Sequence, residues 1–457
     1  MSSLAEVRLW DTRIGAVSLR DGEEVAEFQY SDEFLKSGIQ LSPLVMPLSS
    51  RVYRFPTLPR GTFHGLPGLL SDSLPDRFGN ALIDVWLARQ GRRPESFNAV
   101  ERLCYTGKRG MGALEFVPST GPEAKQAQRI DVENLVRLAS QVLQEKEGLR
   151  VALSGDKQGG VGRTEGARTF SAAGAGNDDK ALLQILRVGT SAGGARAKAV
   201  IAWNPRTNEV RAGQLDAPPG FEHWLIKFDG VKSNRDKELD DPKGFCTVEY
   251  AYHLMARAAG IVMTECRLLP EHGRRHFMTR RFDRTVDGQK IHMQSLGALA
   301  HFDYNRAGAY GYEQAFATIR ALGTAMDDVE QQYRRMVFNI MARNQDDHVK
   351  NISFLMDRGG RWTLAPAYDL TFSYHPSGEW TGTHQMTVNG RRDGFIWGDL
   401  KAVAGVAGLK RGRPEDIARE VHDTVARWPE FADMVGVAPA QRDAIFANLR
   451  LSGELLP

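Results

Sequence analysis

The segment from Asn344 to Asn351 constrains the fold of this 457-residue chain more than any other stretch of similar length. It places an aspartate and an asparagine five residues apart, at Asp346 and Asn351. Residues 327–343, which precede it, carry apolar side chains at helical spacing and acidic residues near their start, so they predict an amphipathic helix. The polar segment is therefore expected to be a loop that begins where this helix ends.

A predicted β-hairpin follows the loop and ends close to another aspartate. Residues 352–365 form two apolar runs separated by a Gly-Gly turn, and Asp369 comes four residues later. Phosphoryl-transfer sites of the protein-kinase type use such parts in this order: a carboxylate base, an amide that binds magnesium and a second carboxylate that holds the metal against the nucleotide phosphates. In this interpretation Asp346 is the base, and Asn351 and Asp369 are the metal ligands.

Three upstream features occur in the order in which kinases use them. Residues 189–196 form a loop of small residues, whose backbone N–H groups can approach phosphates closely. Lys227 lies inside an apolar strand, and a buried lysine needs an anionic partner. Glu249 lies in the first turn of a helix predicted at 247–259, with Thr247 as its N-cap, and is a candidate partner for Lys227. Each feature has an ordinary alternative: a hairpin turn, a lysine on an edge strand and a glutamate that stabilises the helix dipole.

Two further polar residues lie inside the Asp–Asn loop. His348 is a candidate brace for the loop or a phosphate contact, and a purely structural histidine fits the sequence equally well. Lys350 is adjacent to Asn351 and is placed to neutralise a transferring phosphoryl group. The sequence has no Walker-type G-x-x-x-x-G-K-[ST] motif and no zinc or Ser-His-Asp signature, so P-loop, zinc and serine-hydrolase chemistry are disfavoured.

The chain is long enough for more than one domain, and changes in composition indicate where to divide it. Residues 1–180 mix short strands and helices and end in a Gly- and Ser-rich linker at about 154–180. Strands dominate residues 181–285, and helices dominate residues 286–457. We therefore predict an α+β, protein-kinase-like bilobal fold with a mixed strand and helix N-terminal domain, a strand-rich lobe and a largely helical C-terminal lobe.

The composition excludes several classes of protein. The net charge of +3 is small, so charge alone does not require nucleic acid, and the basic clusters at 272–284 and 410–413 are expected to be solvated faces. Cys104, Cys246 and Cys266 are far apart and predict reduced, partly buried thiols. The N-terminus lacks the apolar core of a signal peptide, and no apolar run approaches the roughly 20 residues of a membrane span. A cytoplasmic protein without membrane partners is expected.

These motifs together resemble the HipA family, the serine/threonine-kinase toxins of HipBA-type toxin–antitoxin modules. The resemblance covers nearly the whole chain. It depends most on Asp346-x-His348-x-Lys350-Asn351 and Pro366-Ala367-Tyr368-Asp369. The supporting motifs are Leu74-Pro75-Asp76, Gly112-Ala113-Leu114-Glu115-Phe116, Ser191-Ala192-Gly193-Gly194-Ala195-Arg196-Ala197-Lys198, Ile226-Lys227, Glu249-Tyr250 and Arg281-Phe282-Asp283-Arg284.

The resemblance implies a role for each site residue. Asp346 would be the catalytic base, and Asn351 and Asp369 would bind magnesium. Lys227, paired with Glu249, would contact the α- and β-phosphates of ATP, and the segment from Met278 to Phe282 would be the hinge that binds adenine through its backbone. The implied ATP or phosphate contacts also include Gly193, Gly194, Lys198, Met278, Arg280, Phe282, Gln294, His348 and Lys350.

The resemblance also implies regulation by autophosphorylation. Ser191 matches the loop serine that such kinases phosphorylate on themselves, and Thr190 is a second candidate acceptor. In the family this phosphate withdraws the loop from the ATP site and switches the kinase off. A phosphoserine adds about −1.5 to −2 charges, which would repel ATP phosphates and attract cations such as Lys198 or Lys350.

The chain also departs from the family pattern. A Ser-Leu pair follows Gln294 where the family often has two acidic residues, and Arg196 and Ala197 stand where a well-known member has Gln and Glu. The insertion at 154–180 is long. These differences bear on the substrate, the antitoxin partner and the loop switch, and they leave the metal site intact.

The implied cofactors are ATP and Mg²⁺, and the implied substrate is a translation-related protein such as an aminoacyl-tRNA synthetase. A HipB-like helix-turn-helix antitoxin, and operator DNA through it, are the implied partners. A small-molecule kinase on the same fold is a second interpretation, which the matching N-terminal 180 residues disfavour. A DNA-associated co-repressor is a third, motivated by the two basic clusters, although the chain shows no convincing recognition helix of its own. The sequence leaves the target, the antitoxin and the oligomeric state open.

Overall fold

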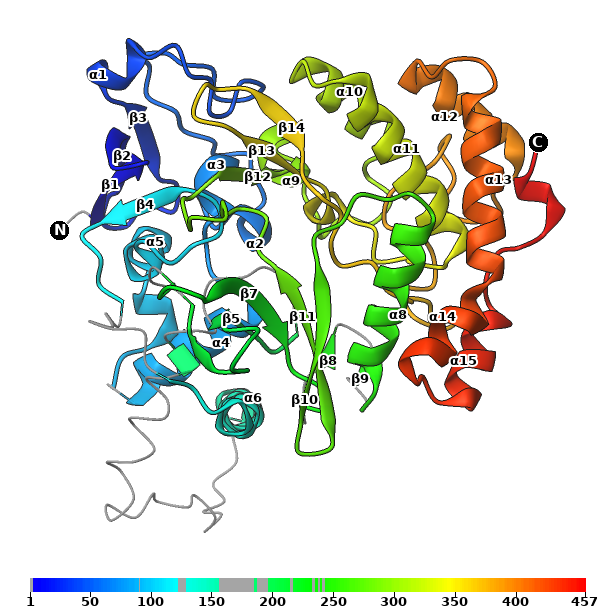
Figure 1. Cartoon of the computed structure of the whole chain (residues 1–457). Coiled ribbons are helices and arrows are strands. Elements are labelled where there is room, and N and C mark those ends of the chain that lie inside the picture. The colour runs from blue at the N-terminus through cyan, green and yellow to red at the C-terminus, as the bar shows by residue number, and fades with distance from the viewer. Residues whose placement is uncertain are drawn as a thin grey trace.

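The protein consists of antiparallel sheets and helices arranged in three parts. Its computed structural model describes residues 3–89, 91–121, 129–155, 185–186, 196–213, 217–231, 235–236, 239–240 and 243–457. Figure 1 shows an N-terminal sheet on the left, a central sheet below the middle and a group of C-terminal helices on the right. This is the predicted α+β, bilobal architecture, with a strand-rich lobe followed by a helical lobe.

The N-terminal part is built on a four-stranded sheet with short helices beside it. Its elements are β1 (Ser3–Leu9), β2 (Thr12–Leu19), β3 (Glu27–Tyr30), β4 (Leu114–Val117), α1 (Asp32–Leu35), α2 (Arg60–Phe63), α3 (Gly68–Ser71) and α5 (Ala99–Thr106). The strand order is β3-β2-β1-β4. Trp10 and Asp11 join β1 to β2 with φ values of 49° and 66°, and two positive φ values define the type I′ turn that matches the twist of a hairpin.

The central sheet is packed between helices on both of its faces. Its elements are β5 (Lys198–Trp203), β6 (Val210–Ala212), β7 (Glu222–Lys227), β10 (Cys266–Glu271) and β11 (Arg274–Arg280), in the order β10-β11-β7-β5-β6, and the helices are α4 (Arg77–Arg89), α6 (Val132–Gly155) and α8 (Phe245–Ala258). Successive strand residues point to opposite faces. Met278 accordingly joins the core that includes α4 and α6, and Phe277 packs with Cys246 of α8. A short pair, β8 (Arg235–Asp236) and β9 (Leu239–Asp240), lies outside this sheet.

The hydrophobic core of the central sheet crosses the domain boundary that was predicted near residue 180. Leu82 of α4 and Leu135 of α6 belong to the same buried cluster as Ile201 of β5 and Trp224 of β7. The first two residues precede the predicted linker and the last two follow it. The N-terminal part and the strand-rich lobe therefore stabilise each other through one shared apolar core.

Helix α8 begins two residues earlier than the sequence predicted. Its N-cap is Gly244, with a φ of 95°, so Thr247 lies within the first turn and does not cap the helix. Glu249 consequently lies in the second turn. Gly260, with a φ of 80°, follows the last residues of the helix as expected. The spacing of apolar residues located the helix, whereas the choice of cap depended on a left-handed glycine that favours such a boundary.

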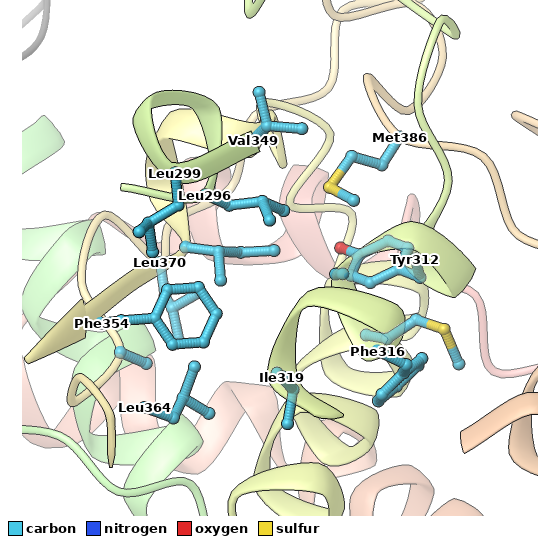
Figure 2. Close-up of a cluster of buried hydrophobic side chains, with 14 of the residues drawn as sticks. Leu296, Leu299, Tyr312, Phe316, Ile319, Val349, Phe354, Leu364, Leu370 and Met386 are labelled. Carbon is cyan, nitrogen blue, oxygen red and sulfur yellow. The ribbon is translucent and has the colours of Figure 1, made fainter. Parts of the chain in front are cut away.

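The C-terminal lobe combines a small sheet with helices. Its elements are β12 (His292–Ser295), β13 (Ser353–Met356), β14 (Trp362–Leu364), α9 (Leu296–Ala300), α10 (Tyr312–Ala321), α11 (Met326–Met341), α12 (Trp397–Ala407), α13 (Arg413–Ala426), α14 (Trp428–Val435) and α15 (Pro439–Phe446). Figure 2 shows Val349 and Leu370 in a buried cluster with Leu296, Phe354 and Tyr312. Because Val349 and Leu370 adjoin the predicted site residues in sequence, this apolar cluster anchors both polar segments.

Part of the basic cluster at 272–284 is buried, so the expectation of a solvated face is wrong there. Arg281 and Arg284 place guanidinium nitrogens 2.6 and 2.9 Å from Asp283 Oδ2, and all three side chains are buried or nearly so. Gly112 also donates its backbone N–H to Asp283 Oδ2 at 2.7 Å. The cluster ties the end of β11 to the loop before β4, because a buried charge requires both a partner and hydrogen bonds.

The thiols are free and buried, as the sequence predicted. Cys104, Cys246 and Cys266 form no disulfide. In the part of the chain that the structure describes, no helix combines the length and apolarity that crossing a membrane requires.

Candidate functional site

A cavity of about 470 Å³ lies where the central sheet, the C-terminal lobe and the N-terminal part meet. The sheet contributes Lys227 and Thr279 to its lining, the C-terminal lobe contributes Asp346 and Asp369, and the N-terminal part contributes Asp76. Pockets for small molecules span roughly 300–1,000 Å³. The cavity is therefore of a suitable size for a nucleotide, and most of the predicted site residues that the structure describes surround it.

Lys227 lies at the end of β7 and contacts two carboxylates. Its Nζ is 2.5 Å from Glu249 Oε1 on α8 and also bonds to Asp369 Oδ1. Burial lowers the pKa of Lys227, but Asp369 and Glu249 outweigh it and raise the pKa above its usual value. Burial has the opposite effect on a carboxylate and raises the pKa of Asp369. Lys227 and other cations outweigh burial and lower the pKa of Asp369 to about 2. Both groups are therefore charged at neutral pH.

The loop after α11 holds Asp346 and Asn351 side by side. Asn351 Nδ2 donates to the backbone carbonyl of Asp346 at 2.9 Å, which closes the five-residue step. An amide has both donor and acceptor atoms, so its oxygen is the group with which Asn351 can bind a metal. Asp369 has a φ of 53°, a conformation uncommon outside glycine that often occurs at functional sites.

Trp380 contacts the predicted base directly, and the sequence did not indicate this. Its indole Nε1 donates to Asp346 Oδ1 at 2.6 Å, and His348 Nε2 lies 3.8 Å from the same oxygen. The chain around Trp380 is held in place because Gln345 donates to the carbonyl of Thr381 at 2.8 Å. The signal that could have identified it is that Trp380 is the only tryptophan between Asp369 and the start of α12.

Asp347, next to the predicted base, points into the core. Its Oδ2 accepts from Tyr312 Oη at 2.8 Å and lies 2.9 Å from His384 Nδ1. Arg450 Nη1 lies 2.8 Å from His384 Nε2. Because arginine only donates, Nε2 accepts in that contact, and Nδ1 donates to Asp347. Burial raises the pKa of Asp347, but His384 and the hydrogen bonds outweigh it, and the pKa lies below its usual value. Asp347 therefore fixes the loop from behind.

Several buried polar atoms of the cavity lining have no hydrogen-bond partner within the described residues. They are Arg281 Nη1, His348 Nδ1, Asp76 Oδ2 and Glu249 Oε2, of which the two carboxylate oxygens lie within ion-pair distance of Lys198 and Arg196, at 3.6 and 3.8 Å. Buried polar groups are normally satisfied, so the cavity suits a polar, charged ligand. Mg²⁺ prefers oxygen ligands and is commonly held by one or two carboxylates together with substrate phosphates. Asn351 and Asp369 fit that pattern, so the residues present are compatible with a nucleotide and magnesium.

The remaining predicted contacts divide into three groups. Those that line the cavity are Lys198, Arg280, Phe282, His348 and Lys350. The side chains of Met278 and Gln294 point elsewhere: Met278 lies in the core with Ile226, and Gln294 donates to the carbonyl of Leu41. Their strand neighbours Thr279 and Met293 line the cavity, because side chains alternate along a strand. Thr190, Ser191, Gly193 and Gly194 lie outside the described residues.

The N-terminal part lines the cavity to an extent that the sequence did not indicate. Asp72 accepts from the backbone N and Oγ of Ser295 at 2.7 and 2.9 Å. Asp76 Oδ2 lies 3.6 Å from Lys198 Nζ. Burial raises the pKa of Asp76 to about 6, although Lys198 lowers it. The Leu74-Pro75-Asp76 motif was visible in the sequence, but its position beside Lys198 depends on how the domains pack.

The fold and this cavity define a protein of the bilobal, kinase-like class. Residues 190–428 match the family model of the HipA-like C-terminal domain, and residues 5–117 match that of the HipA N-terminal domain. The chain belongs to the HipA family.

Individual proteins are also similar to this chain. A putative kinase, Y4dM of Sinorhizobium fredii, is 27% identical over 246 residues, which cover 48% of this chain and 54% of that protein. The chain thus spans about half the length of this curated relative. HipA of Shewanella oneidensis, solved with HipB and its operator DNA, superposes with a TM-score of 0.63 at 17% identity, covering 97% of this chain and 94% of that one. The kinase CtkA of Helicobacter pylori gives a TM-score of 0.36 at 11% identity, covering 56% and 87%.

Proposed function

We propose that this protein is an ATP- and Mg²⁺-dependent serine/threonine protein kinase of the HipA type, which acts as the toxin of a toxin–antitoxin module. The observation that carries the proposal is the position of Lys227 between Glu249 and Asp369, in the same cavity as Asp346 and Asn351. A buried lysine braced by two carboxylates can hold nucleotide phosphates, and phosphoryl transfer needs positioning and electrostatic stabilisation more than covalent chemistry.

Each residue would have a distinct task in this reaction. Lys227 would hold the nucleotide phosphates, and Asn351 and Asp369 would hold Mg²⁺. Bound Mg²⁺ supplies neutralisation of the phosphate charge. Asp346 would accept the proton of the attacking serine or threonine hydroxyl at its carboxylate, and Lys350, which lines the same cavity, would stabilise negative charge that develops near it.

The proposal extends to partners and regulation. Family membership and the HipA fold support a translation-related protein substrate, such as an aminoacyl-tRNA synthetase, and a HipB-like antitoxin that would bring the complex to operator DNA. The solved relative was crystallised with HipB and its operator DNA. We also propose that the kinase phosphorylates its own Gly-rich loop at Ser191, with Thr190 as the neighbouring candidate.

The experiment that tests this function is transfer of labelled phosphate from ATP. The purified protein with Mg²⁺ is expected to label itself, and mass spectrometry is expected to find the phosphate on Ser191 or Thr190. EDTA should abolish labelling, because the metal neutralises the phosphates. Labelled metabolites without labelled protein would instead indicate a small-molecule kinase. An absence of any transfer, despite correct folding by circular dichroism, would contradict the proposed activity.

Trp380→Phe is expected to lower kcat by about 10- to 100-fold while the KM for ATP changes little. The variant keeps an aromatic ring but removes the hydrogen bond to Asp346, and a hydrogen bond to a charged group contributes about 1.5–3 kcal/mol. Steady-state kinetics measure this effect. Trp10→Phe is the matched control, because Trp10 is also partly buried and donates its indole N–H to a backbone carbonyl, that of Lys290, at 2.8 Å. Equal kcat values for both variants would exclude a role for Trp380.

A further inference from the structure

We infer that the N-terminal domain contributes a positioning residue to the phosphate end of the cavity: Asp76 holds Lys198 in place, as Glu249 holds Lys227. The inference rests on the proposed kinase function, which it deepens by assigning a role to the N-terminal domain. That domain would then be a structural part of the nucleotide site, in addition to any contacts that it makes with other proteins.

The two lysines form a directly opposed pair in the central sheet. Lys198 of β5 lies opposite Lys227 of β7 in the antiparallel register, and both line the cavity. Side chains directly opposite each other on neighbouring strands lie on the same face, and like charges in this arrangement destabilise a sheet. Each buried lysine therefore needs a carboxylate of its own. Lys227 has Glu249 and Asp369, which belong to the kinase-like lobes.

Lys198 pairs with a carboxylate from the N-terminal part of the chain. Its Nζ lies 3.6 Å from Asp76 Oδ2, and only 2% of each side chain is exposed. At this depth water screens the interaction weakly, so the carboxylate has a strong influence on where the ammonium group lies. Lys198 is thus held by a residue that lies more than a hundred positions earlier in the sequence, outside the lobe that carries the lysine.

Asp76 also stabilises the start of helix α4. An experiment therefore has to distinguish this capping contact from the contact with Lys198. Asp76 Oδ1 accepts from the backbone N–H of Gly79 at 2.5 Å, as an N-cap does. Its Oδ2 is buried, makes no hydrogen bond among the described residues and lies 3.6 Å from Lys198 Nζ. One oxygen therefore serves the helix and the other serves Lys198. An asparagine at this position can keep the first contact while it loses the charge of the second.

Other lysines and carboxylates of the cavity also interact across different parts of the chain. Lys350 of the C-terminal lobe interacts electrostatically with Asp72 and Asp76, and Lys198 interacts with Asp369. Acidic residues of the N-terminal part therefore face two of the cavity lysines.

The first test compares Asp76→Asn, Lys198→Met and the double variant in phosphate transfer. Asp76→Asn is expected to lower kcat by about 10- to 100-fold, because displacing a catalytic group by about 1 Å can cost about 100-fold. The dissociation constant of the protein for the Mg²⁺ complex of AMP-PNP, measured by calorimetry, should change less than about threefold. The double variant should have the kcat of Lys198→Met, because the two residues act through one contact. Additive losses, or a wild-type kcat in Asp76→Asn, would overturn the inference.

The second test does not depend on activity. Reductive methylation with formaldehyde and cyanoborohydride starts from the neutral amine, and its extent at Lys198 can be followed by mass spectrometry. Loss of the Asp76 charge makes deprotonation of Lys198 easier, so methylation of Lys198 should be several-fold faster in Asp76→Asn. Asp131→Asn is the matched control, since Asp131 is exposed and accepts from the backbone of Glu133 near the start of α6. Equal methylation rates in the two variants would refute the pairing.

The two tests separate failure of this inference from failure of the proposed function. If the wild-type protein transfers no phosphate, the kinase proposal fails, and the methylation rates still decide whether Asp76 holds Lys198. If the wild-type protein transfers phosphate and Asp76→Asn behaves like it in both tests, only the inference fails. The melting temperature of Asp76→Asn is expected to fall, because asparagine keeps the N-cap but leaves the buried ammonium group of Lys198 without its carboxylate.

Discussion

Asp346→Asn is expected to lower the rate of phosphate transfer by about 1,000-fold or more. General-base catalysis by a placed side chain contributes about 10²- to 10⁴-fold, and an uncharged amide cannot accept the proton of the attacking hydroxyl. The amide oxygen can still accept the hydrogen bond from Trp380, so the loop should keep its shape. Single-turnover measurements with labelled ATP would give the rate, and nucleotide binding measured separately should be nearly unchanged.

Two neighbouring aspartates provide the controls for this result. Asp357, in the turn between β13 and β14, is half-exposed and accepts backbone hydrogen bonds that an asparagine can also accept, so Asp357→Asn should retain wild-type transfer. Asp347→Asn should instead lower the melting temperature, because Asp347 is buried against Tyr312 and His384. Wild-type transfer by Asp346→Asn would exclude Asp346 as the base and leave its interaction with Trp380 as a structural contact.

Asp283→Ala is expected to destabilise the protein by about 3–5 kcal/mol, because it would leave two buried guanidinium groups without their partner. Arg281 and Arg284 both contact Asp283 Oδ2, and the backbone N–H of Gly112 does so as well. The variant would therefore weaken the connection between the end of β11 and the N-terminal part. Urea denaturation followed by circular dichroism gives the free energy of unfolding, provided that the transition is reversible and two-state.

The same cluster should make stability sensitive to acid. Burial raises the pKa of Asp283, but Arg281 and Arg284 outweigh it and hold the pKa far below the usual range of a carboxyl group. The stabilisation is thus fully present above the pKa of the unfolded carboxyl, about 4, and is lost as the pH falls below that value toward the folded pKa. In Asp283→Ala this contribution to acid sensitivity should disappear.

A surface ion pair serves as the control for Asp283. Glu430 pairs with Arg427 at 2.8 Å, and both side chains are more than half exposed. Pairs of this kind contribute little to stability because water and salt screen them. Glu430→Ala should leave the urea midpoint unchanged. A midpoint for Asp283→Ala that equals that of Glu430→Ala would show that the buried cluster does not stabilise the fold.

The sequence allowed the local elements of the site to be predicted because they follow from periodicity and spacing. Apolar residues at helical intervals located α11, observed at Met326–Met341, and two apolar runs around a Gly-Gly turn located β13 and β14. Asp346 and Asn351 lie in the short loop between α11 and β13, so they were expected to be close together, and a hydrogen bond joins them. These are short-range properties, and each depends on residues within about one helical turn or one hairpin.

The errors arose where long-range contacts decided the outcome. Thr247 is a good N-cap by type, yet the N-cap of α8 is Gly244, whose backbone N–H donates to Asp229 Oδ1 at 2.9 Å. Arg281 and Arg284 lie in a cluster of positive residues that resembles a solvated face, yet Asp283 and the N-terminal loop bury them. A sequence window contains the arginines and Asp283, but it does not contain the N-terminal loop around Gly112 that covers them.

What the sequence by itself determined is the order and type of the proposed site residues: an aspartate, an asparagine amide and a second carboxylate, with a lysine upstream. Their spacing is a property of the chain and is readable without a structure. The tertiary structure alone decided that Trp380 donates to Asp346 and that Asp76 faces Lys198. Both contacts join segments that are distant in sequence, and only the packing of the apolar cores brings such segments together, because hydrophobic burial is strong but does not specify which polar groups will meet.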